Sequence, residues 1–305
     1  MSSIAPDSTP QRLLTVQDYD LDATLASGQA FGWTRHRNGW TGAIGNRWVS
    51  LSASPGGIAV RTASDPGDWA WLLHYLQAEV VLQPILDTFP KDPAMTDSIA
   101  DCRGLRLLRQ DPWECLASFI LSSTKQILQI QQICALLRER FGRPLVVPDG
   151  EVSRNSFPSA AAIAASSETE LRACKMGFRA PSLLQAAQAV SEGRLALEAL
   201  QGQTLEQARE SLCSLRGVGP KIANCVLLFA YGFPGAFPVD VWVLRALREL
   251  YFPRRHPSAQ RLERFVRTHF GPNAGYAQQY LFHFIRQREG RVAKTESPSQ
   301  SRSSL

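Results

Sequence analysis

Lys221 and Asp240 are the residues of this sequence whose type and setting point most directly to chemistry. Lys221 follows Gly217-Val218-Gly219-Pro220 and falls in the first turn of the helix that these residues begin. A helix N-terminus disfavours a cation, and the apolar residues that follow reduce its solvation. Both effects favour a neutral amine, which can attack an electrophilic carbon and form a Schiff base. The alternative is a surface lysine that pairs with phosphate groups.

Asp240 follows a Gly/Pro-rich loop and precedes the segment 241–250, whose apolar residues have helical spacing. It can therefore cap that helix and stay ionised through hydrogen bonds from the first amides. A fixed carboxylate could also stabilise the positive charge that develops on a sugar when a glycosidic bond breaks. The two roles are compatible, although capping alone would explain an aspartate at this position.

A helix-hairpin-helix pattern holds both residues. Within segment 212–244, two helices are joined by Gly217, Val218 and Gly219, and a loop leads from the second helix to Asp240. The glycines allow a tight turn and let backbone amides approach a DNA phosphate, so we expect these three residues to bind DNA without reading its sequence. A dinucleotide-binding loop is excluded because the third glycine is missing and the loop follows a helix.

The composition is that of a basic globular chain. Of its 305 residues 44% are hydrophobic, and 33 Lys+Arg against 27 Asp+Glu give a net charge of +6, which suits a polyanion such as nucleic acid. Six arginines lie in segment 248–267, although a solvated helix face would also explain them. No secretion signal or long uncharged apolar run occurs. We therefore expect an intracellular, DNA-associated monomer, in a bacterial cytoplasm or a eukaryotic nucleus, with no membrane span.

The six cysteines form no CxxC pair. Neither a zinc site nor a disulfide framework is predicted, and we expect no metal and no cofactor.

Hydrophobic periodicity predicts an α+β fold. Short apolar segments over residues 10–65 are separated by turn residues such as Asn38-Gly39, which is the pattern of an antiparallel meander. From Asp68, which we expect to cap a helix, the period becomes helical. We expect a capping box at Asp111-Pro112-Trp113-Glu114 and a left-handed helix end at Gly142.

Three regions follow from these patterns. We predict a β-rich N-terminal domain at residues 1–95 and an all-helical region at 96–289, whose two lobes enclose the active site and can share helices with the N-terminal part. The segment 290–305 is rich in Ser, Lys and Arg and should be disordered.

The hairpin, Lys221, the Gly/Pro-rich loop and Asp240 together resemble the helix-hairpin-helix (HhH-GPD) superfamily of DNA glycosylases. Within it, the lysine is typical of the bifunctional branch, which has both glycosylase and lyase activity. Iron-sulfur members such as the endonuclease III group carry four cysteines after the aspartate. No cysteine follows Cys225 here, so that subgroup is excluded.

Further motifs are similar to those of the 8-oxoguanine DNA glycosylases. The similarity extends over roughly residues 12–288 and rests on four segments, at 27–33, 111–120, 176–180 and 275–278. It implies that Gly28 offers its carbonyl to the hydrogen that 8-oxoguanine carries on nitrogen 7, where guanine has an acceptor. It also implies that Gln278 reads the Watson–Crick edge of an extruded base, while Phe282 and Cys225 cover its two faces.

Each of these residues also has a structural explanation from sequence alone: a turn glycine, an exposed glutamine, a core phenylalanine and a buried cysteine.

The sequence departs from the family pattern near the expected DNA surface. Segment 124–126, beginning with Thr124, replaces an asparagine run that fills the gap in the duplex, and Gln129 replaces an arginine that contacts the cytosine opposite the lesion. Phe178 replaces a wedging tyrosine, Arg179 is matched, and Trp242 replaces a histidine near the phosphates. We expect these residues to contact DNA, with a weakened preference for cytosine.

The sequence thus predicts a bifunctional 8-oxoguanine DNA glycosylase/lyase of base excision repair, with Lys221 as nucleophile and Asp240 as electrostatic stabiliser. Two alternatives remain: a glycosylase for alkylated bases that activates water with the aspartate, and a non-catalytic lesion-binding protein. Ring-opened purines are possible substrates beside 8-oxoguanine.

Overall fold

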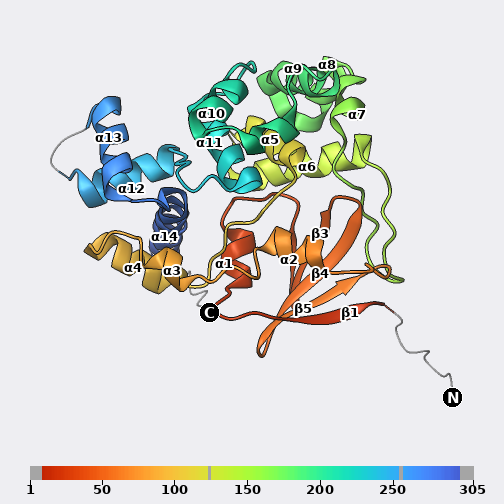
Figure 1. Cartoon of the computed structure of the whole chain (residues 1–305). Helices are drawn as coiled ribbons and strands as arrows, with labels where there is room; N and C mark the ends of the chain where they lie inside the picture. Colours follow the sequence, from red (N-terminus) through yellow and green to blue (C-terminus); the bar gives the residue numbers. More distant parts are fainter. Residues whose placement is uncertain (1–8, 123–124, 254–256, 296–305) are drawn as a thin grey trace, which may run out of the picture.

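Alternating side chains and tight turns build an antiparallel sheet in the N-terminal part, as predicted (Figure 1). The computed structural model describes residues 9–122, 125–253 and 257–295. Turns at Arg37-Asn38, Gly45-Asn46 and Pro55-Gly56 connect four consecutive strands in a meander. The strands are β1 (Gln11–Thr15), β2 (Thr34–His36), β3 (Gly39–Ile44), β4 (Arg47–Ser54) and β5 (Gly57–Thr62).

The first strand joins the sheet at the opposite edge from its sequence neighbour. The order is β1-β5-β4-β3-β2, because helix α1 (Leu21–Ala26) lies between β1 and β2 and carries the chain across the sheet. In β5, Ile58 and Val60 point into a core that also receives Leu25 of α1 and Leu72 of α2 (Ala70–Leu76). Buried and half-buried residues alternate along β5 because helices cover one face of the sheet.

Helices predominate after the sheet in the part of the chain that the structure describes, so the α+β prediction is confirmed. They are α3 (Gln83–Leu86), α4 (Pro93–Cys102), α5 (Pro112–Leu121), α6 (Ile127–Phe141), α7 (Ala160–Ala164), α8 (Glu168–Leu171), α9 (Ala180–Ser191), α10 (Leu205–Cys213), α11 (Pro220–Val226), α12 (Val241–Tyr251), α13 (Ala259–His269) and α14 (Ala274–Thr295). Short turns of other helical types are η2 (Arg172–Met176), η3 (Gly177–Arg179), η4 (Leu197–Gly202) and η5 (Leu227–Tyr231).

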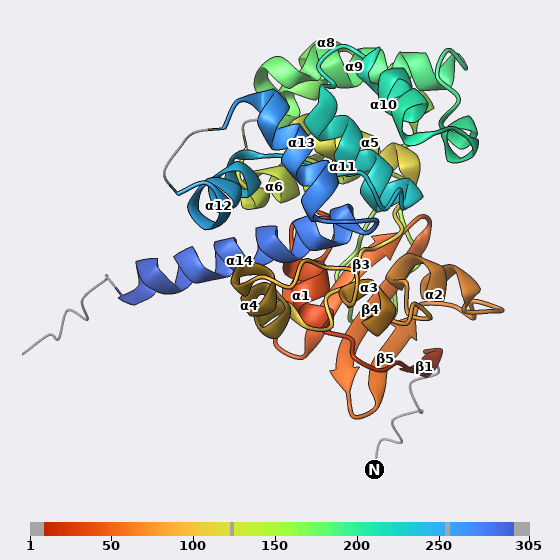
Figure 2. The ribbon, with the colours of Figure 1, turned by 60° about the vertical axis from the view of Figure 1, so that its left-hand side comes forward.

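The helices fall into two groups around the sheet domain. One group runs from α5 to α11, and the other consists of α12, α13 and α14 together with α3 and α4 (Figure 1). Figure 2 shows α14 as a long helix that extends beside α4 and beneath α12. The domain boundary near residue 95 remains our proposal. Leu86 of α3 and Met95 of α4 pack in the hydrophobic core of the later helices, so helices before this boundary also contribute to the helical part.

Helix α14 is longer than predicted. It continues to Thr295, so the first six residues of the tail expected to be disordered are helical, and residues 296–305 lie outside the described residues. An ion pair between Arg288 and Glu249 joins this end of α14 to α12. A helix end that extends beyond the core needs no apolar face, so its sequence can be as polar as that of a disordered tail. Composition alone therefore could not separate the two.

Three predicted helix ends differ in detail. Helix α2 begins at Ala70, and Asp68 accepts a hydrogen bond from the Ala70 amide (2.9 Å) without being the N-cap residue. Asp111 caps α5 as expected, but Glu114 turns to Arg138 and closes no capping box. Gly142 is extended (φ −79°), not left-handed; glycine fits because a Cβ would lie 2.2 Å from the carbonyl oxygen of Ser156.

None of the helices in the described part of the chain combines the length and the apolar character needed to cross a lipid bilayer.

Candidate active site

The loop before β2, the end of α5, the start of α11, the start of α12 and the inner face of α14 surround a cavity of about 650 Å³. Residues from both helical groups line it, so it lies between them, where the sequence predicted the active site. Seven of the predicted site residues line this cavity: Gly28, Lys221, Cys225, Asp240, Trp242, Gln278 and Phe282.

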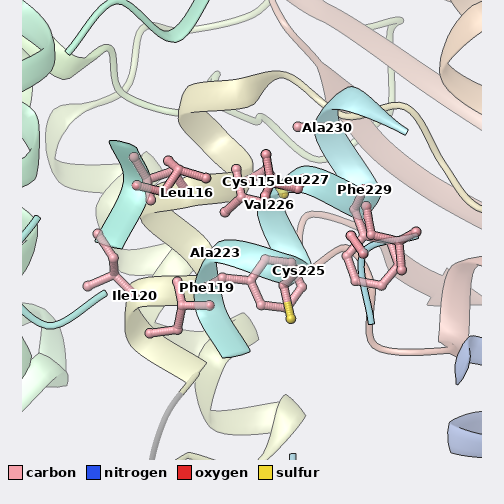
Figure 3. Close-up of a cluster of buried hydrophobic side chains, with 14 of the residues drawn as sticks. Cys115, Leu116, Phe119, Ile120, Ala223, Cys225, Val226, Leu227, Phe229 and Ala230 are labelled. Atoms are coloured by element: carbon pink, nitrogen blue, oxygen red, sulfur yellow. The ribbon is translucent and has the colours of Figure 1, made fainter. Parts of the chain in front are cut away.

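Lys221 occupies the second position of α11, as predicted. Gly219 is the N-cap residue and Pro220, which has no amide hydrogen to leave unpaired, takes the first helical position. The buried face of α11, with Cys225 and Val226, packs on α5 (Figure 3). This packing fixes the helix that carries the amine at the floor of the cavity.

Ser122 holds the amine of Lys221. The Lys221 Nζ donates a hydrogen bond of 2.8 Å to Ser122 Oγ, and it lies 5.7 Å from the centre of the Phe119 ring. Ser122 Oγ in turn donates its one hydrogen to the Phe119 carbonyl (2.7 Å). The hydroxyl can therefore only accept from the lysine, and the lone pair of a neutral amine stays available for attack.

Asp240 is the N-cap of α12, as predicted. Its Oδ1 accepts a hydrogen bond of 2.8 Å from the Val243 amide, and the same side chain lines the cavity. A carboxylate with a fixed position therefore lies on the same cavity as the lysine.

Cys225 is 3% exposed and lies one helical turn after Lys221. Burial raises the pKa of its thiol to about 12, against the opposing effect of the nearby Lys221 ammonium. Asp240 raises the pKa further. The sulfur is thus a neutral, polarisable surface on the cavity wall, which suits contact with a flat ring and not nucleophilic attack.

Gly28 forms the opposite wall in a backbone conformation that favours glycine (φ +79°). A Cβ there would lie 2.5 Å from Ile127 Cδ1. Its neighbour Gln29 is fully buried. The side-chain Nε2 of Gln29 donates to the backbone carbonyls of Thr24 (3.0 Å) and Arg106 (2.8 Å). Its Oε1 accepts from the Leu108 amide (2.8 Å). Gln29 thereby anchors the Gly28 loop to the segment that enters α5.

Gln278 and Phe282 lie one helical turn apart on α14 and both line the cavity, as their spacing predicted. Gln278 is 3% exposed, and its Oε1 is buried with no hydrogen-bond partner among the described residues. An unsatisfied buried carbonyl costs about 1–3 kcal/mol. A ligand that brings a donor would remove this cost, and the N1–H and N2–H edge of a guanine is such a donor.

The other predicted residues that the structure describes do not line the cavity. Phe178 is 60% exposed, and the Arg179 guanidinium lies over its ring, 4.9 Å from the ring centre. Arg179 also donates to the Gly217 carbonyl (3.3 Å), so this pair lies beside the hairpin. Thr124 lies outside the described residues.

Within the hairpin, the backbone amide of Val218 is already hydrogen-bonded inside the protein. The Val218 amide donates to the Leu215 carbonyl (3.1 Å), and the Val218 side chain is buried. A Cβ on Gly217 would lie 2.6 Å from Ser182 Oγ, whereas one on Gly219 would meet nothing within 4 Å. The backbone is therefore open to a ligand at Gly219, and the phosphate-binding prediction rests mainly there.

Gln129 forms part of the N-terminal cap of α6. Its Oε1 accepts a hydrogen bond of 3.0 Å from the Gln126 amide. In this arrangement the Gln129 side chain caps the start of α6. It is also shorter than the arginine of the family pattern.

No group of three or more metal-binding side chains occurs within the described part of the chain.

Comparison with known proteins matches both parts of this architecture. Residues 13–116 match the 8-oxoguanine DNA glycosylase N-terminal domain, and residues 117–272 match the HhH-GPD superfamily of base excision DNA repair proteins. The N-glycosylase/DNA lyase OGG1 of Arabidopsis thaliana is 34% identical over 288 residues, which cover 88% of this chain and 78% of the relative. The chain belongs to the 8-oxoguanine DNA glycosylase family.

Two further proteins are similar to this chain. A probable N-glycosylase/DNA lyase of Methanothermobacter thermautotrophicus is 31% identical over 219 residues, covering 65% of this chain and 69% of the relative. The 8-oxoguanine glycosylase/lyase of Clostridium acetobutylicum, solved with double-stranded DNA that contains cytosine opposite 8-oxoguanine, superimposes with a TM-score of 0.84 at 26% identity. That superposition covers 93% of this chain and 99% of the other.

Ser122 and Arg286 are among the cavity residues of this 8-oxoguanine DNA glycosylase that sequence reasoning missed. Ser122 ends α5, whose family-like segment had been noted only up to Ile120. Arg286 lies on α14 one turn beyond Phe282, so the spacing that identified Gln278 and Phe282 could have identified it too.

Proposed function

We propose that this protein is a bifunctional DNA glycosylase/lyase that removes 8-oxoguanine from duplex DNA in base excision repair. The observation that carries the proposal is the cavity itself. It joins the Lys221 side-chain nitrogen, a fixed carboxylate and an unsatisfied amide carbonyl on one concave surface.

The reaction follows from this geometry once a base is extruded into the cavity. The base stacks between Phe282 and Cys225 with its Watson–Crick edge toward Gln278, and its nitrogen 7 toward Gly28. Lys221 Nζ attacks the anomeric carbon of the sugar, and the electron pair of the bond to the base leaves with the base. Asp240 stabilises the positive charge that develops on the sugar.

The lyase step uses the same lysine. After the base has left, the secondary ammonium group formed by the attack loses a proton. The nitrogen lone pair then opens the sugar ring, whose oxygen takes up a proton, and an imine forms between Lys221 and the sugar carbon. The imine withdraws electrons from the neighbouring carbon, a proton is removed there, and the 3′ phosphate leaves by β-elimination. Hydrolysis of the imine then releases the enzyme.

Trapping with borohydride tests the proposal. The protein is incubated with a duplex that contains one 8-oxoguanine, and borohydride reduces any imine to a stable amine. We expect a covalent complex with wild-type protein and none with Lys221→Gln. A glycosylase that activates water would release the base without an adduct, and a lesion-binding protein would do neither, so either result would refute the proposed function.

We propose further that the preference for cytosine opposite the lesion is weak. Gln129 is engaged at the end of α6, and of the expected cytosine-reading residues only Arg179 is retained. Excision rates should therefore differ little among duplexes with A, C, G or T opposite 8-oxoguanine. A strong preference for cytosine would contradict this view of Gln129.

We also propose that one chain acts alone on DNA. All the residues assigned to the reaction line a cavity formed by a single chain. Light scattering of the protein with one duplex should give a one-to-one complex, and a stable two-to-one complex would contradict the monomer. The same assay with ring-opened purines would define the range of lesions.

A further inference from the structure

Arg286 is a cation in the cavity wall to which the reaction described above gives no role. It lies on α14, four residues after Phe282 and eight after Gln278, so the three side chains follow one face of the helix. All three line the cavity. Arg286 therefore extends the row of side chains that would surround an extruded base.

The guanidinium of Arg286 lies between the two walls of the cavity. Its Cζ is 5.2 Å from the centre of the Phe282 ring. On the other side, Nη1 lies 3.4 Å from the position that a Cβ on Gly28 would occupy. A base that stacks on Phe282 next to Gly28 would thus contact this group.

The guanidinium has a donor to spare. Arg286 Nη1 is buried and has no hydrogen-bond partner among the described residues, which also form no ion pair with this side chain. Burial lowers the pKa of Arg286, while the charge of Asp240 opposes that effect. A buried guanidinium nitrogen without an acceptor is costly, as is the Gln278 carbonyl oxygen without a donor. A ligand that offers a donor to Gln278 and an acceptor to Arg286 would relieve both costs.

The chemistry of base loss creates such an acceptor. When Lys221 Nζ bonds to the anomeric carbon, the electron pair of the broken bond remains on the base, which leaves with a negative charge spread over its ring nitrogens and carbonyl oxygens. The base later takes a proton that the lysine nitrogen releases. A fixed guanidinium stabilises this anion without giving up a proton of its own.

We propose that Arg286 is a catalytic residue that binds the extruded base and stabilises the negative charge on the departing base. This inference rests on the proposed function and assigns to the leaving group a cation of its own, distinct from Lys221. Asp240 and Arg286 then act at the two ends of one breaking bond, the carboxylate on the sugar and the guanidinium on the base.

The two activities of the enzyme allow a direct test, because a preformed abasic site has no base to release. We expect Arg286→Ala to slow single-turnover release of 8-oxoguanine by about 100-fold. Its rate of strand cleavage at a preformed abasic site should remain that of the wild type. Arg288, which lies in the same helix but is exposed and paired with Glu249, supplies the control variant Arg288→Ala, with both rates unchanged.

Chemical rescue distinguishes charge from shape. Guanidinium ion at millimolar concentration should restore base release by Arg286→Ala, whereas urea, which is neutral and of the same shape, should not. Arg286→Met, which replaces the stem of the side chain, carries the same comparison if the alanine variant does not fold. Arg286→Lys should lose less activity than Arg286→Met.

Several results would overturn the role of Arg286. These are equal loss of base release and strand cleavage in the variant, no loss of base release, or equal rescue by urea. A wild-type protein that neither releases 8-oxoguanine nor cleaves an abasic site would instead overturn the proposed function, and the two failures are therefore distinct.

Discussion

Asp240→Asn should separate the two roles of this aspartate. Asparagine is about as good an N-cap as aspartate, so the hydrogen bond to the Val243 amide (2.8 Å) should survive the change. The negative charge is lost. Loss of one electrostatic group that stabilises a transition state lowers the rate by about 10²–10³-fold, which corresponds to roughly 2.7–4 kcal/mol. We expect base release to fall by this factor while the melting temperature stays the same.

Asp240→Ala should add a loss of stability. Removing an N-cap side chain costs about 0.5–2 kcal/mol of unfolding free energy, and the melting temperature should fall by a few degrees. Its rate of base release should be as low as that of the asparagine variant, since both lack the charge.

Asp111 supplies the matched control for these variants. It caps α5 with a side-chain hydrogen bond of the same length, accepting a bond of 2.8 Å from the Glu114 amide, but it does not line the cavity. Asp111→Asn should leave both stability and single-turnover base release unchanged. If Asp240→Asn released 8-oxoguanine at the wild-type rate, capping would be the whole role of Asp240 and our reasoning would be refuted.

Three further changes test other contacts of the site. Ser122→Ala removes the acceptor for Lys221 and should slow borohydride trapping by about 5-fold, the equivalent of one hydrogen bond of roughly 1 kcal/mol, without weakening DNA binding in a gel shift. Gly28→Ala should abolish base release because of the clash with Ile127, whereas Gly56→Ala, with a similar φ of +80° and nothing within 4 Å, should cost only about 1–2 kcal/mol of stability. Equal activity of the two glycine variants would contradict this. Burial, assisted by the charge of a neighbouring arginine, lowers the pKa of His283 to about 4, so the unfolded chain takes up a proton before the folded one as the pH falls below 6.5. Unfolding free energy should therefore decrease by up to roughly 3 kcal/mol between pH 6.5 and 4, and a denaturant titration of His283→Gln should show a flatter profile.

The parts of the site that depend on local sequence could be predicted. Lys221 and Asp240 stand at helix starts, where glycine, proline and capping residues fix the backbone within a few positions. Gln278 and Phe282 share a face because of helical spacing alone. These inferences needed no knowledge of how distant segments meet.

The contacts that join distant segments could not be predicted. Ser122 holds Lys221 across 99 positions, and Glu114 leaves its own helix end for Arg138 because a buried guanidinium needs an anion more than an exposed amide does. Strand β1 joins the far edge of the sheet through pairing with β5, which depends on the path of α1. Local propensity does not contain such partners, since long-range packing selects them.

The anchoring of Gln29 bears on how fast the enzyme can examine DNA. Because the buried hydrogen bonds of Gln29 hold the Gly28 loop in its final form before any base arrives, the entropy of ordering this wall is spent during folding and not during each encounter. In the proposed binding mode the Gly28 carbonyl faces nitrogen 7 of an extruded base, where an intact guanine has an acceptor, so we expect guanine to return to the helix without waiting for a loop to rearrange. A short dwell time at each normal base would allow the enzyme to examine many such bases for every lesion that it finds.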